Sequence, residues 1–442
     1  MQKNSFSISK FFLYFHCKQM LRKPHLGSVS RNMAVRLSAK LLITISSVAI
    51  CNILFLYLLQ TQKSATTLIE TFTSSDWSTP IENRTLFKHG ASTSTKPKKI
   101  LLWNSYWGLK AVWQKIFAEI QYDRCPQSNC ILTVNKSEVD TSDIVLFHLV
   151  DLPTSNYTFP VRQNTNQIWM AMTYEPPYIM EYAEVNFHRL NGIFNRTMSY
   201  RSDSDVTVRH GTFVPITKET WFPRQLTRWV DAHDSVETRN YAEGKKRLVS
   251  WFASSRYCKS QSGREKFVTE LQKYIPVDVY GYCGPYKCGV QKTLRHPYKV
   301  EHDDCYLMVS LGYKFVLAFE NSICEDYVTE KLFNNLRLNV IPIVFGGANY
   351  SLFAPPKSYI NAREYNPQEL AEYLQLLDGN DTLYNEYFAW KSKYYIEAHN
   401  GVPLACDLCA QAHNPNWAVE KKVYEHFDTW VHTGCFPGYE QS

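Results

Sequence analysis

One uncharged apolar stretch constrains this chain more than any other feature. Residues Leu41 to Leu59 read LLITISSVAICNILFLYLL and contain no charged side chain. A helix of that length crosses a hydrocarbon core of about 30 Å. A cleaved signal peptide is the alternative, but the stretch is too long for a signal-peptide core, begins far from residue 1 and lacks a small-x-small cleavage site after Leu59. The stretch therefore predicts a transmembrane signal-anchor.

The distribution of charge predicts the orientation of this helix. The whole chain carries 48 Lys and Arg against 41 Asp and Glu, a net charge of +7. Residues 1–40 hold eight of the basic residues and no acidic one, which leaves a net charge of −1 for the rest. Positive charge flanks a membrane helix on its cytosolic side. We therefore expect a cytosolic tail over 1–40 and a lumenal body, which is near neutral and argues against a nucleic-acid partner.

Glycosylation sequons support this orientation. Asn-x-Ser/Thr acceptors are glycosylated in the secretory pathway, and here all of them follow the predicted span. The predicted acceptors are Asn83, Asn135, Asn156, Asn195, Asn349 and Asn380.

The cysteines also indicate an oxidising compartment. Ten of the 12 cysteines follow the predicted span, an even number that suits disulfides, although spacing alone does not give the pairing. Cys406-x-x-Cys409 together with Cys283 and Cys288 could suggest a zinc site. Such a site is disfavoured because Cys283 and Cys288 have an unsuitable spacing and no histidine pair completes the ligands. A redox Cys-x-x-Cys motif is disfavoured because no strand-to-helix turn carries it. The disulfide candidates are Cys125, Cys130, Cys283, Cys288, Cys406 and Cys409.

The remaining sequence divides into a stem, two folded halves and a tail. Residues 60–97 are rich in Ser and Thr with little apolar periodicity, which predicts a flexible stem. Two α/β halves are expected over 98–240 and 247–400, joined by the polar stretch 230–247. A cysteine-containing tail, 401–442, is expected to pack back on the body.

Short continuous apolar runs predict strands that are buried on both faces, as in parallel sheets covered by helices. Two such halves predict a ligand in the cleft between them, at the carboxyl ends of the strands. From Asn366 onward the chain is expected to be mostly helical. The predicted strands are 98–105, 129–134, 142–150, 166–174, 247–253, 276–281, 313–319 and 339–346, and the predicted helices are 263–274 and 327–336.

The first motif that indicates chemistry is Ser262-Gly-Arg-Glu265, which has the form of a capping box and so predicts a helix start. Arg264 lies in line with the apolar residues Phe267, Val268 and Leu271, so it points along the buried stripe of the helix. Two interpretations remain: a snorkelling side chain at a helix end, or a guanidinium that captures an anion at the free N–H groups there.

The second motif is the run FENSICEDYVTEK over 319–331, which follows an apolar strand and opens a helix. Its acidic residues complement the dipole of a helix N-terminus without any function. Lys331 opposes that dipole, and a bound anion such as a phosphate would explain it.

The third motif is Glu175 followed by Pro176 and Pro177, where a predicted strand ends. A surface glutamate at a turn is the structural interpretation. The functional interpretation is a general base opposite the phosphate-binding half.

These segments resemble the α1,3/4-fucosyltransferases, a family of inverting, GDP-fucose-dependent Golgi enzymes with a GT-B-like fold. YKFVLAFENS…DYVTEKLF (313–333) is similar to the family's donor-binding motif, and WMAMTYEPP (169–177) to the stretch that carries its catalytic base. FNRTMSYRSDSDV (194–206) is similar to a third block. The resemblance covers most of 98–410, and Cys283-Gly-Pro-Tyr-Lys-Cys288 looks most like the invertebrate branch, nematodes in particular.

The resemblance implies a role for each matching residue. Glu175 would deprotonate the 3-hydroxyl of an acceptor GlcNAc while fucose leaves GDP with inversion. Arg264 and Lys331 would hold the diphosphate, and Glu330 would bind fucose hydroxyls and support an oxocarbenium-like transition state. The remaining donor contacts implied by the resemblance are Asn321 and Tyr327, with Tyr200 reaching fucose from the opposite half.

The resemblance also implies the setting of the reaction. Two fixed cations would replace a metal ion, so no cofactor is required, although Mn²⁺ could stimulate. The C-terminal Cys-x-x-Cys would pair Cys406 and Cys409 with Cys125 and Cys130. The expected location is the Golgi membrane, as a single-pass type II protein, with a homodimer through the stem or membrane helix left open. The acceptor, an N-glycan core or a lactosamine or LacdiNAc antenna, is also left open.

Two other functions account for part of the sequence. Asp203-Ser-Asp205 has the form of the DxD motif of metal-dependent Golgi glycosyltransferases, whose oxygen ligands suit Mn²⁺. The structural interpretation makes Asp203 and Asp205 loop acids beside Arg201 and Arg209. A lectin-like type II ectodomain without enzymatic activity explains the anchor, sequons and cysteines, but not the other motifs.

Overall fold

The computed structural model describes residues 96–108, 127, 129–152, 157–216, 239–253, 258–288, 304–398 and 402–440. Every described residue belongs to one compact unit, Ile81–Ser442. The predicted cytosolic tail, membrane helix and nearly all of the stem lie outside the described residues. Among the residues that are described, no helix has the length and apolar character needed to cross a membrane.

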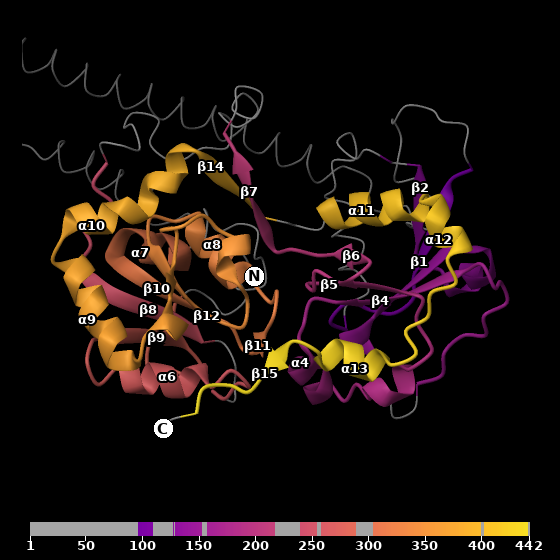
Figure 1. The fold of residues 1–442 in the computed structure, drawn as a ribbon, viewed down its shortest axis with the longest axis horizontal. Coiled ribbons are helices and arrows are strands. Elements are labelled where there is room, and N and C mark those ends of the chain that lie inside the picture. Colours follow the sequence, from indigo (N-terminus) through magenta and orange to yellow (C-terminus); the bar gives the residue numbers. More distant parts are fainter. Residues whose placement is uncertain are drawn as a thin grey trace, which may run out of the picture. The chain divides into compact units, whose positions relative to one another are not determined.

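The first half of the described chain forms a six-stranded sheet with the order β2-β1-β3-β4-β5-β6 (Figure 1). All neighbouring strands are parallel, as the continuous apolar runs predict. The strands are β1 (Lys98–Leu102), β2 (Cys130–Thr133), β3 (Ile144–His148), β4 (Ile168–Thr173), β5 (Arg196–Ser199) and β6 (Val206–Thr207).

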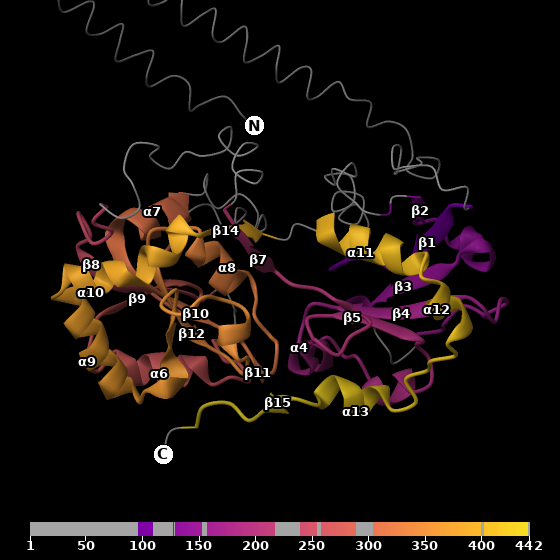
Figure 2. The same cartoon turned by 45° about the horizontal axis from the view of Figure 1, so that its top comes forward.

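The C-terminal part of the chain covers both faces of this sheet. Leu408 and Trp417, from α11 (Val402–Ala412) and α12 (Pro415–Val419), join the core on one face. Phe427 of α13 (Phe427–His432) joins the core on the other face, and Figure 2 shows these helices on opposite sides of the sheet. These contacts bring residues of the predicted tail, 401–442, against the six-stranded sheet. The other helical segments of this half are α4 (Pro177–Tyr182), η3 (Lys136–Thr141), η4 (Leu149–Asp151) and η5 (Phe187–Leu190).

The second half forms a five-stranded parallel sheet with the order β13-β12-β10-β8-β9. Its strands are β8 (Arg247–Ala253), β9 (Val277–Gly281), β10 (Tyr313–Phe319), β12 (Ile341–Phe345) and β13 (Ile360–Asn361). The core on one face includes residues of α6 and α9, and α8 packs on the other. The helical segments are α6 (Arg264–Leu271), α7 (Asp304–Gly312), α8 (Glu330–Leu336), α9 (Pro367–Asp378), α10 (Asp381–Asn385), η9 (Tyr350–Leu352), η10 (Ala362–Glu364) and η11 (Glu386–Ser392).

Two short antiparallel ladders complete the fold. β7 (Gly211–Pro215) pairs with β14 (Tyr394–Ala398), and β11 (Ile323–Cys324) pairs with β15 (Cys435–Phe436). The two C-terminal strands interrupt the helices expected after Asn366.

The predicted capping box at Ser262 and Glu265 is wrong. The helix begins at Arg264 with Gly263 as its N-cap, and Gly263 has a φ of 69° and makes no side-chain cap. The hydroxyl of Ser262 donates to the carbonyl of Glu320 at 2.7 Å, and Glu265 accepts from Ser260 at 2.6 Å. The hydroxyl of Ser262 also accepts from the N–H of Arg264 at 3.4 Å, but Ser262 and Glu265 do not form the reciprocal pair of bonds that defines a capping box.

The helix predicted from residue 327 begins three residues later. The side chain of Thr329 caps α8 by accepting from the backbone N–H of Lys331, so the helical hydrogen bonds start at Glu330.

Four disulfides connect described cysteines. Cys130–Cys409 agrees with the pairing implied by the resemblance. The candidates Cys283 and Cys288 pair with Cys258 and Cys305, and Cys324 pairs with Cys435. Cys406 is disulfide-bonded as well. Cys125 lies outside the described residues, so its pairing with Cys406 stays a prediction.

The start of β7 provides a test of how tightly this fold is packed. A Cβ atom on Gly211 would lie 2.5 Å from Cγ and 2.8 Å from Cβ of Phe333 in α8. Gly211→Ala should therefore lower the free energy of unfolding by about 1–3 kcal/mol through overpacking. Gly312→Ala is the matched control, because among the described residues no atom lies within 4 Å of its added Cβ. Denaturant unfolding measures both, and equal effects would contradict this account of the packing.

Candidate active site

Side chains from the two sheets meet where their parallel strands end. Glu175 follows β4 by two residues, Tyr200 follows β5 directly, and Tyr327 precedes α8. The hydroxyl of Tyr327 donates to Oε2 of Glu175 at 3.3 Å. The rings of Tyr200 and Tyr327 form an edge-to-face pair with centroids 5.0 Å apart. The structure thus brings together three of the predicted site residues.

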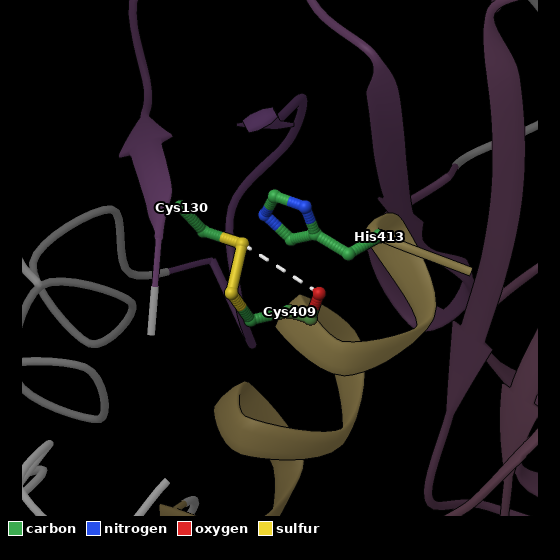
Figure 3. Close-up of side chains that lie close together, drawn as sticks. All are labelled: Cys130, Cys409 and His413. Atoms are coloured by element: carbon green, nitrogen blue, oxygen red, sulfur yellow. Dashed lines mark hydrogen bonds between the residues drawn. A yellow bond between two sulfur atoms is a disulfide. The ribbon is translucent and has the colours of Figure 1, made fainter. Parts of the chain in front are cut away.

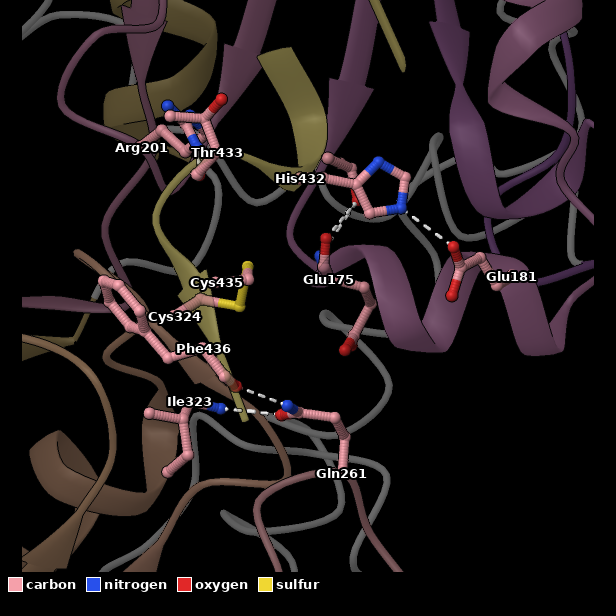
Figure 4. Close-up of a disulfide and its surroundings, with 11 residues drawn as sticks. Glu175, Glu181, Arg201, Gln261, Ile323, Cys324, His432, Thr433, Cys435 and Phe436 are labelled. Carbon is pink, nitrogen blue, oxygen red and sulfur yellow. Dashed lines mark hydrogen bonds and ion pairs between the residues drawn. A yellow bond between two sulfur atoms is a disulfide. The ribbon is translucent and has the colours of Figure 1, made fainter. Parts of the chain in front are cut away.

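The turn after β4 fixes the backbone of Glu175. Its N–H donates to the hydroxyl of Thr173 at 2.9 Å, and that hydroxyl donates to the carbonyl of Glu175 at 3.0 Å. Pro176 then caps α4, which has Pro177 as its first residue. Figure 4 shows Glu175 beside this helix. The turn therefore fixes the backbone of Glu175, while its carboxylate is held by the hydrogen bond from Tyr327.

The surroundings of Glu175 hold its pKa well above the ordinary value of a carboxylic acid. Burial raises the pKa most, and the negative charge of Glu330 adds to this. The positive charge of Lys331 and the hydrogen bond from Tyr327 act in the opposite direction, and the result is a pKa of about 7. A carboxylate with this pKa can accept a proton near neutral pH.

Lys331 has a protein anion beside it, which sequence reasoning missed. Its Nζ lies 3.0 Å from Oε2 of the fully buried Glu320 and 3.4 Å from Oε1 of Glu330. Burial alone would lower the pKa of Lys331, but the two carboxylates raise it above its ordinary value. The lysine therefore stays charged at the start of α8 even where it opposes the helix dipole.

Glu320 also anchors the cap of α8. Its carboxylate accepts from the backbone N–H of Thr329 at 2.8 Å and from the hydroxyl of Thr329 at 2.9 Å. Burial raises the pKa of Glu320, against the effect of Lys331. In the sequence, Glu320 is marked only by its position directly after an apolar strand. Its role is not visible there, because the residues that it binds are 9 and 11 positions further on.

Glu330 lies between two basic side chains. Its carboxylate is 3.4 Å from Nζ of Lys331 and 3.7 Å from Nδ1 of His210, which precedes β7. Burial would raise the pKa of Glu330, but Lys331 and His210 outweigh burial and lower it to about 2. Glu330 is therefore ionised at every pH near neutral, in contrast to Glu175.

Arg264 points into the protein, as its place on the apolar stripe predicts. Its guanidinium donates to the carbonyl of Phe319 at 2.7 Å and to Glu265 at 3.2 Å, and lies 5.8 Å from the ring centre of Trp251. The side chain is buried, so the interpretation as a solvent-directed, snorkelling arginine is wrong. A guanidinium has five N–H donors, and these two bonds do not exhaust them.

Three buried polar atoms near Glu320 have no hydrogen-bond partner among the described residues: Oδ1 of Asn321, Oγ of Ser322 and the hydroxyl of Tyr350. Such atoms are costly unless a ligand or water binds them. Asn321 was predicted, whereas Ser322 and Tyr350 were missed. The sequence did not indicate Tyr350, because this residue belongs to η9 and comes near Glu320 only in the folded chain.

The two acids of the Asp203-Ser-Asp205 sequence bind protein groups. Asp203 pairs with Arg201 at 2.8 Å and accepts from the indole of Trp430 at 3.1 Å. Asp205 pairs with Lys422 at 2.9 Å and accepts from the hydroxyl of Tyr424 at 2.9 Å. Both carboxylates connect the first half to the C-terminal segment, which supports their interpretation as structural acids.

One group of potential metal ligands occurs among the described residues. Cys130, Cys409 and His413 place their ligand atoms within 4.8 Å of one another (Figure 3). The two sulfur atoms are joined in a disulfide, and His413 bonds to the carbonyl of Asn129 at 2.8 Å. A disulfide offers no thiolate to a metal, so the role of this group is structural.

The described sequons differ in their surroundings. Asn349 and Asn380 are exposed, and each caps a helix with its side-chain oxygen. Asn135 is half-buried and caps η3. Asn195 is half-buried, accepts from the N–H of Trp169 and donates to the carbonyl of Lys422. The remaining predicted acceptors, Asn83 and Asn156, lie outside the described residues.

Comparison with known proteins places both halves of the chain in one group. Residues 95–211 match a family model described as fucosyltransferase, N-terminal. Residues 242–430 match one described as glycosyltransferase family 10 (fucosyltransferase) C-term.

Two curated relatives and one solved structure illustrate the similarity. The chain is 34% identical over 355 residues to alpha-(1,3)-fucosyltransferase C of Drosophila melanogaster, covering 76% of this chain and 78% of the relative. It is 34% identical over 349 residues to glycoprotein 3-alpha-L-fucosyltransferase A of the same organism, covering 76% and 61%. A crystal structure of alpha1,3-fucosyltransferase with GDP-fucose superimposes with a TM-score of 0.46 at 18% identity, covering 74% of this chain and 94% of the other.

Proposed function

The chain belongs to the fucosyltransferases of glycosyltransferase family 10, and from this we propose that it transfers L-fucose from GDP-fucose to the 3-hydroxyl of a GlcNAc residue, with inversion. The observation that carries the proposal is the environment of Glu175, whose carboxylate has a pKa of about 7 and accepts a hydrogen bond from Tyr327. Tyr327 comes shortly before Glu330 and Lys331 in the chain, and these two form an ion pair.

In this reaction Glu175 takes the proton of the acceptor hydroxyl while the oxygen attacks the anomeric carbon of fucose. The bond from that carbon to the diphosphate breaks, and GDP leaves. One base on the face opposite the leaving group is sufficient for inversion, without a covalent intermediate. The raised pKa of Glu175 supports this role, because it matches proton transfer near neutral pH.

The donor residues act through fixed charges. Arg264 and Lys331 bind the diphosphate and stabilise the negative charge that GDP gains on leaving. Glu330 is ionised and binds fucose hydroxyls, where its negative charge favours a positively charged sugar ring in the transition state. The further donor contacts are Tyr327, Tyr200 and Asn321, whose buried Oδ1 has no hydrogen-bond partner in the part of the chain that the structure describes.

We propose that no metal cofactor is required, although a divalent cation such as Mn²⁺ could stimulate. Two observations support this. Asp203 and Asp205 are each held by a cation of the protein and a further hydrogen bond. Arg264 and Lys331 supply positive charge that a metal ion supplies in DxD enzymes.

The proposed setting is the Golgi membrane, with a type II anchor at residues 41–59 and the described body in the lumen. The apolar stretch, the basic tail, the sequons and the disulfides support it. The proposed acceptors are GlcNAc-containing glycans, and a homodimer through the stem or membrane helix is compatible with this topology.

The central experiment is a transfer assay with the purified full-length protein, GDP-fucose and defined glycans that represent an N-glycan core, a lactosamine and a LacdiNAc antenna. We expect GDP release, and a fucose on the 3-hydroxyl of GlcNAc by mass spectrometry and NMR. The rate should be unchanged in EDTA. Glycan binding without GDP release would favour a lectin, and loss of activity in EDTA that Mn²⁺ restores would favour a DxD-type enzyme.

Substitutions should separate the base from the donor site. Glu175→Gln keeps the shape of the side chain but removes the base, so we expect GDP affinity to stay the same while kcat falls by about 10²–10⁴-fold. Lys331→Ala removes a cation from the diphosphate site, so we expect weaker GDP binding. Titration calorimetry with GDP and steady-state kinetics measure the two effects. Equal GDP affinity in both variants and the wild type would contradict this division of roles.

The pH dependence should report the ionisation of Glu175. Only the ionised carboxylate accepts a proton, so kcat/KM should fall as the pH drops through about 7. The hydrogen bond from Tyr327 lowers this pKa, so Tyr327→Phe should move the acid limb to higher pH. Tyr373→Phe, which removes a hydroxyl bonded to Tyr387, is the control and should leave the limb in place. A limb near pH 4.5 in the wild type would argue against Glu175 as the base.

A further inference from the structure

The last described segment of the chain contacts both halves of the candidate active site. We define residues 420–440 as the C-terminal strap. It runs past the six-stranded sheet as α13, continues through β15 and ends beside α6, as Figures 1 and 2 show. The family model ends at residue 430, so the second part of the strap lies beyond the matched region.

The first part of the strap is fixed to the half that carries Glu175. Phe427 is fully buried in the core of that half. Asp428 pairs with His188 at 2.7 Å, and His432 contacts Glu181 of α4 at 2.8 Å. The carbonyl of Thr433 accepts from Arg201, the residue after Tyr200. Figure 4 shows the contact between His432 and Glu181 near Glu175.

The middle of the strap is bonded to the donor motif. The Cys324–Cys435 disulfide and the β11–β15 ladder join the two segments, and the N–H of Glu325 donates to the carbonyl of Gly434 at 2.7 Å. Cys324 belongs to a small buried cluster with Tyr200 and Tyr327, and the partly buried Cys435 packs against this cluster. The disulfide is therefore packed against the tyrosine that binds Glu175.

The end of the strap is fitted against the start of α6. The side chain of Gln261 accepts from the N–H of Ile323 at 2.9 Å and donates to the carbonyl of Phe436 at 2.5 Å, as Figure 4 shows. The N–H of Tyr439 donates to the carbonyl of Ser262 at 2.8 Å. These bonds fix the two residues that precede the N-cap of the helix.

Two glycines allow the backbones to approach this closely. A Cβ atom on Gly263 would lie 2.3 Å from the carbonyl oxygen of Tyr439, and one on Gly438 would lie 1.9 Å from that of Gln261. Any side chain at either position would push the strap away from the residue before Arg264.

From these contacts we infer that the C-terminal strap is a positioning element for the donor site, with the Cys324–Cys435 disulfide and Gln261 as its principal positioning residues. The inference rests on the proposed function for the identity of the donor. The strap fixes Tyr327 through β11 and Arg264 through residues 261–263, and it is itself fixed to the half that carries Glu175. Small displacements of such groups have large effects on binding and rate.

A strap that serves stability alone predicts a different result from one that positions the donor site. The test variant is the double substitution Cys324→Ser/Cys435→Ser, which leaves no free thiol from this pair. The matched control is Cys130→Ser/Cys409→Ser, which removes another disulfide that closes a long loop, but in the core under α11 and away from the donor motif. Thermal unfolding, GDP affinity and the KM values for GDP-fucose and acceptor are measured for both.

We expect both double variants to lower Tm. Only Cys324→Ser/Cys435→Ser should raise the Kd of GDP and the KM of GDP-fucose, by about tenfold or more, with a smaller change in the acceptor KM. Unchanged GDP affinity in this variant would overturn the inference and make the strap a stabilising element only.

A second variant covers the case in which the double variant does not fold. Gln261→Ala removes the bridge between β11 and the strap while every disulfide remains, and it should also raise the Kd of GDP. Gln368→Ala, on the exposed side of α9, is its control. An unchanged Kd in Gln261→Ala would count against the inference. A wild-type protein that binds GDP but transfers no fucose would overturn the proposed function, while GDP affinity still tests the strap.

Discussion

The buried carboxylate of Glu320 is the interaction on which the rest of the site depends. It follows β10 directly, and it holds the backbone and hydroxyl of Thr329 and the ammonium of Lys331 within 3.0 Å. A buried charge is tolerated only when it is paired and hydrogen-bonded. These bonds meet that requirement, and they also fix where α8 begins. The position of the helix start then determines where Tyr327, Glu330 and Lys331 lie, because all three are within a few residues of the cap.

The same cluster explains why the two glutamates Glu175 and Glu330 have very different pKa values. Glu330 lies between Lys331 and His210, so its pKa falls to about 2 in spite of burial. Glu175 approaches from the other half, is reached by the hydroxyl of Tyr327, and has a pKa of about 7 because burial outweighs the more distant charge of Lys331. Environments that push the pKa values of two acids apart are typical of sites with one permanent charge and one proton acceptor.

Local sequence patterns predicted the fold well. The features that were missed depend on contacts between residues far apart in the chain. The strands at 247–253 and 313–319 have the predicted bounds, because strands buried on both faces are continuous apolar runs. β5 was missed because its sequence, Arg196-Thr-Met-Ser199, is polar although fully buried, with Arg196 paired to Glu420 far along the chain. The capping box failed for a similar reason, since the strap occupies the space beside Gly263. Arg264, Lys331 and Glu175 could be predicted from motifs, whereas Glu320's role depends on its partners.

The two cations of the site are held by groups of the protein itself, and this bears on how a diphosphate would be bound and released. Lys331 contacts two carboxylates, and Arg264 contacts Glu265 and the carbonyl of Phe319. Such partners fix the direction of each cation before a ligand binds, so little reorganisation is needed during the reaction. They also offset part of the positive charge, so the attraction for a free diphosphate is weaker than it would be at an isolated pair of cations. A site built in this way favours charge that develops at a fixed position over tight binding of any anion.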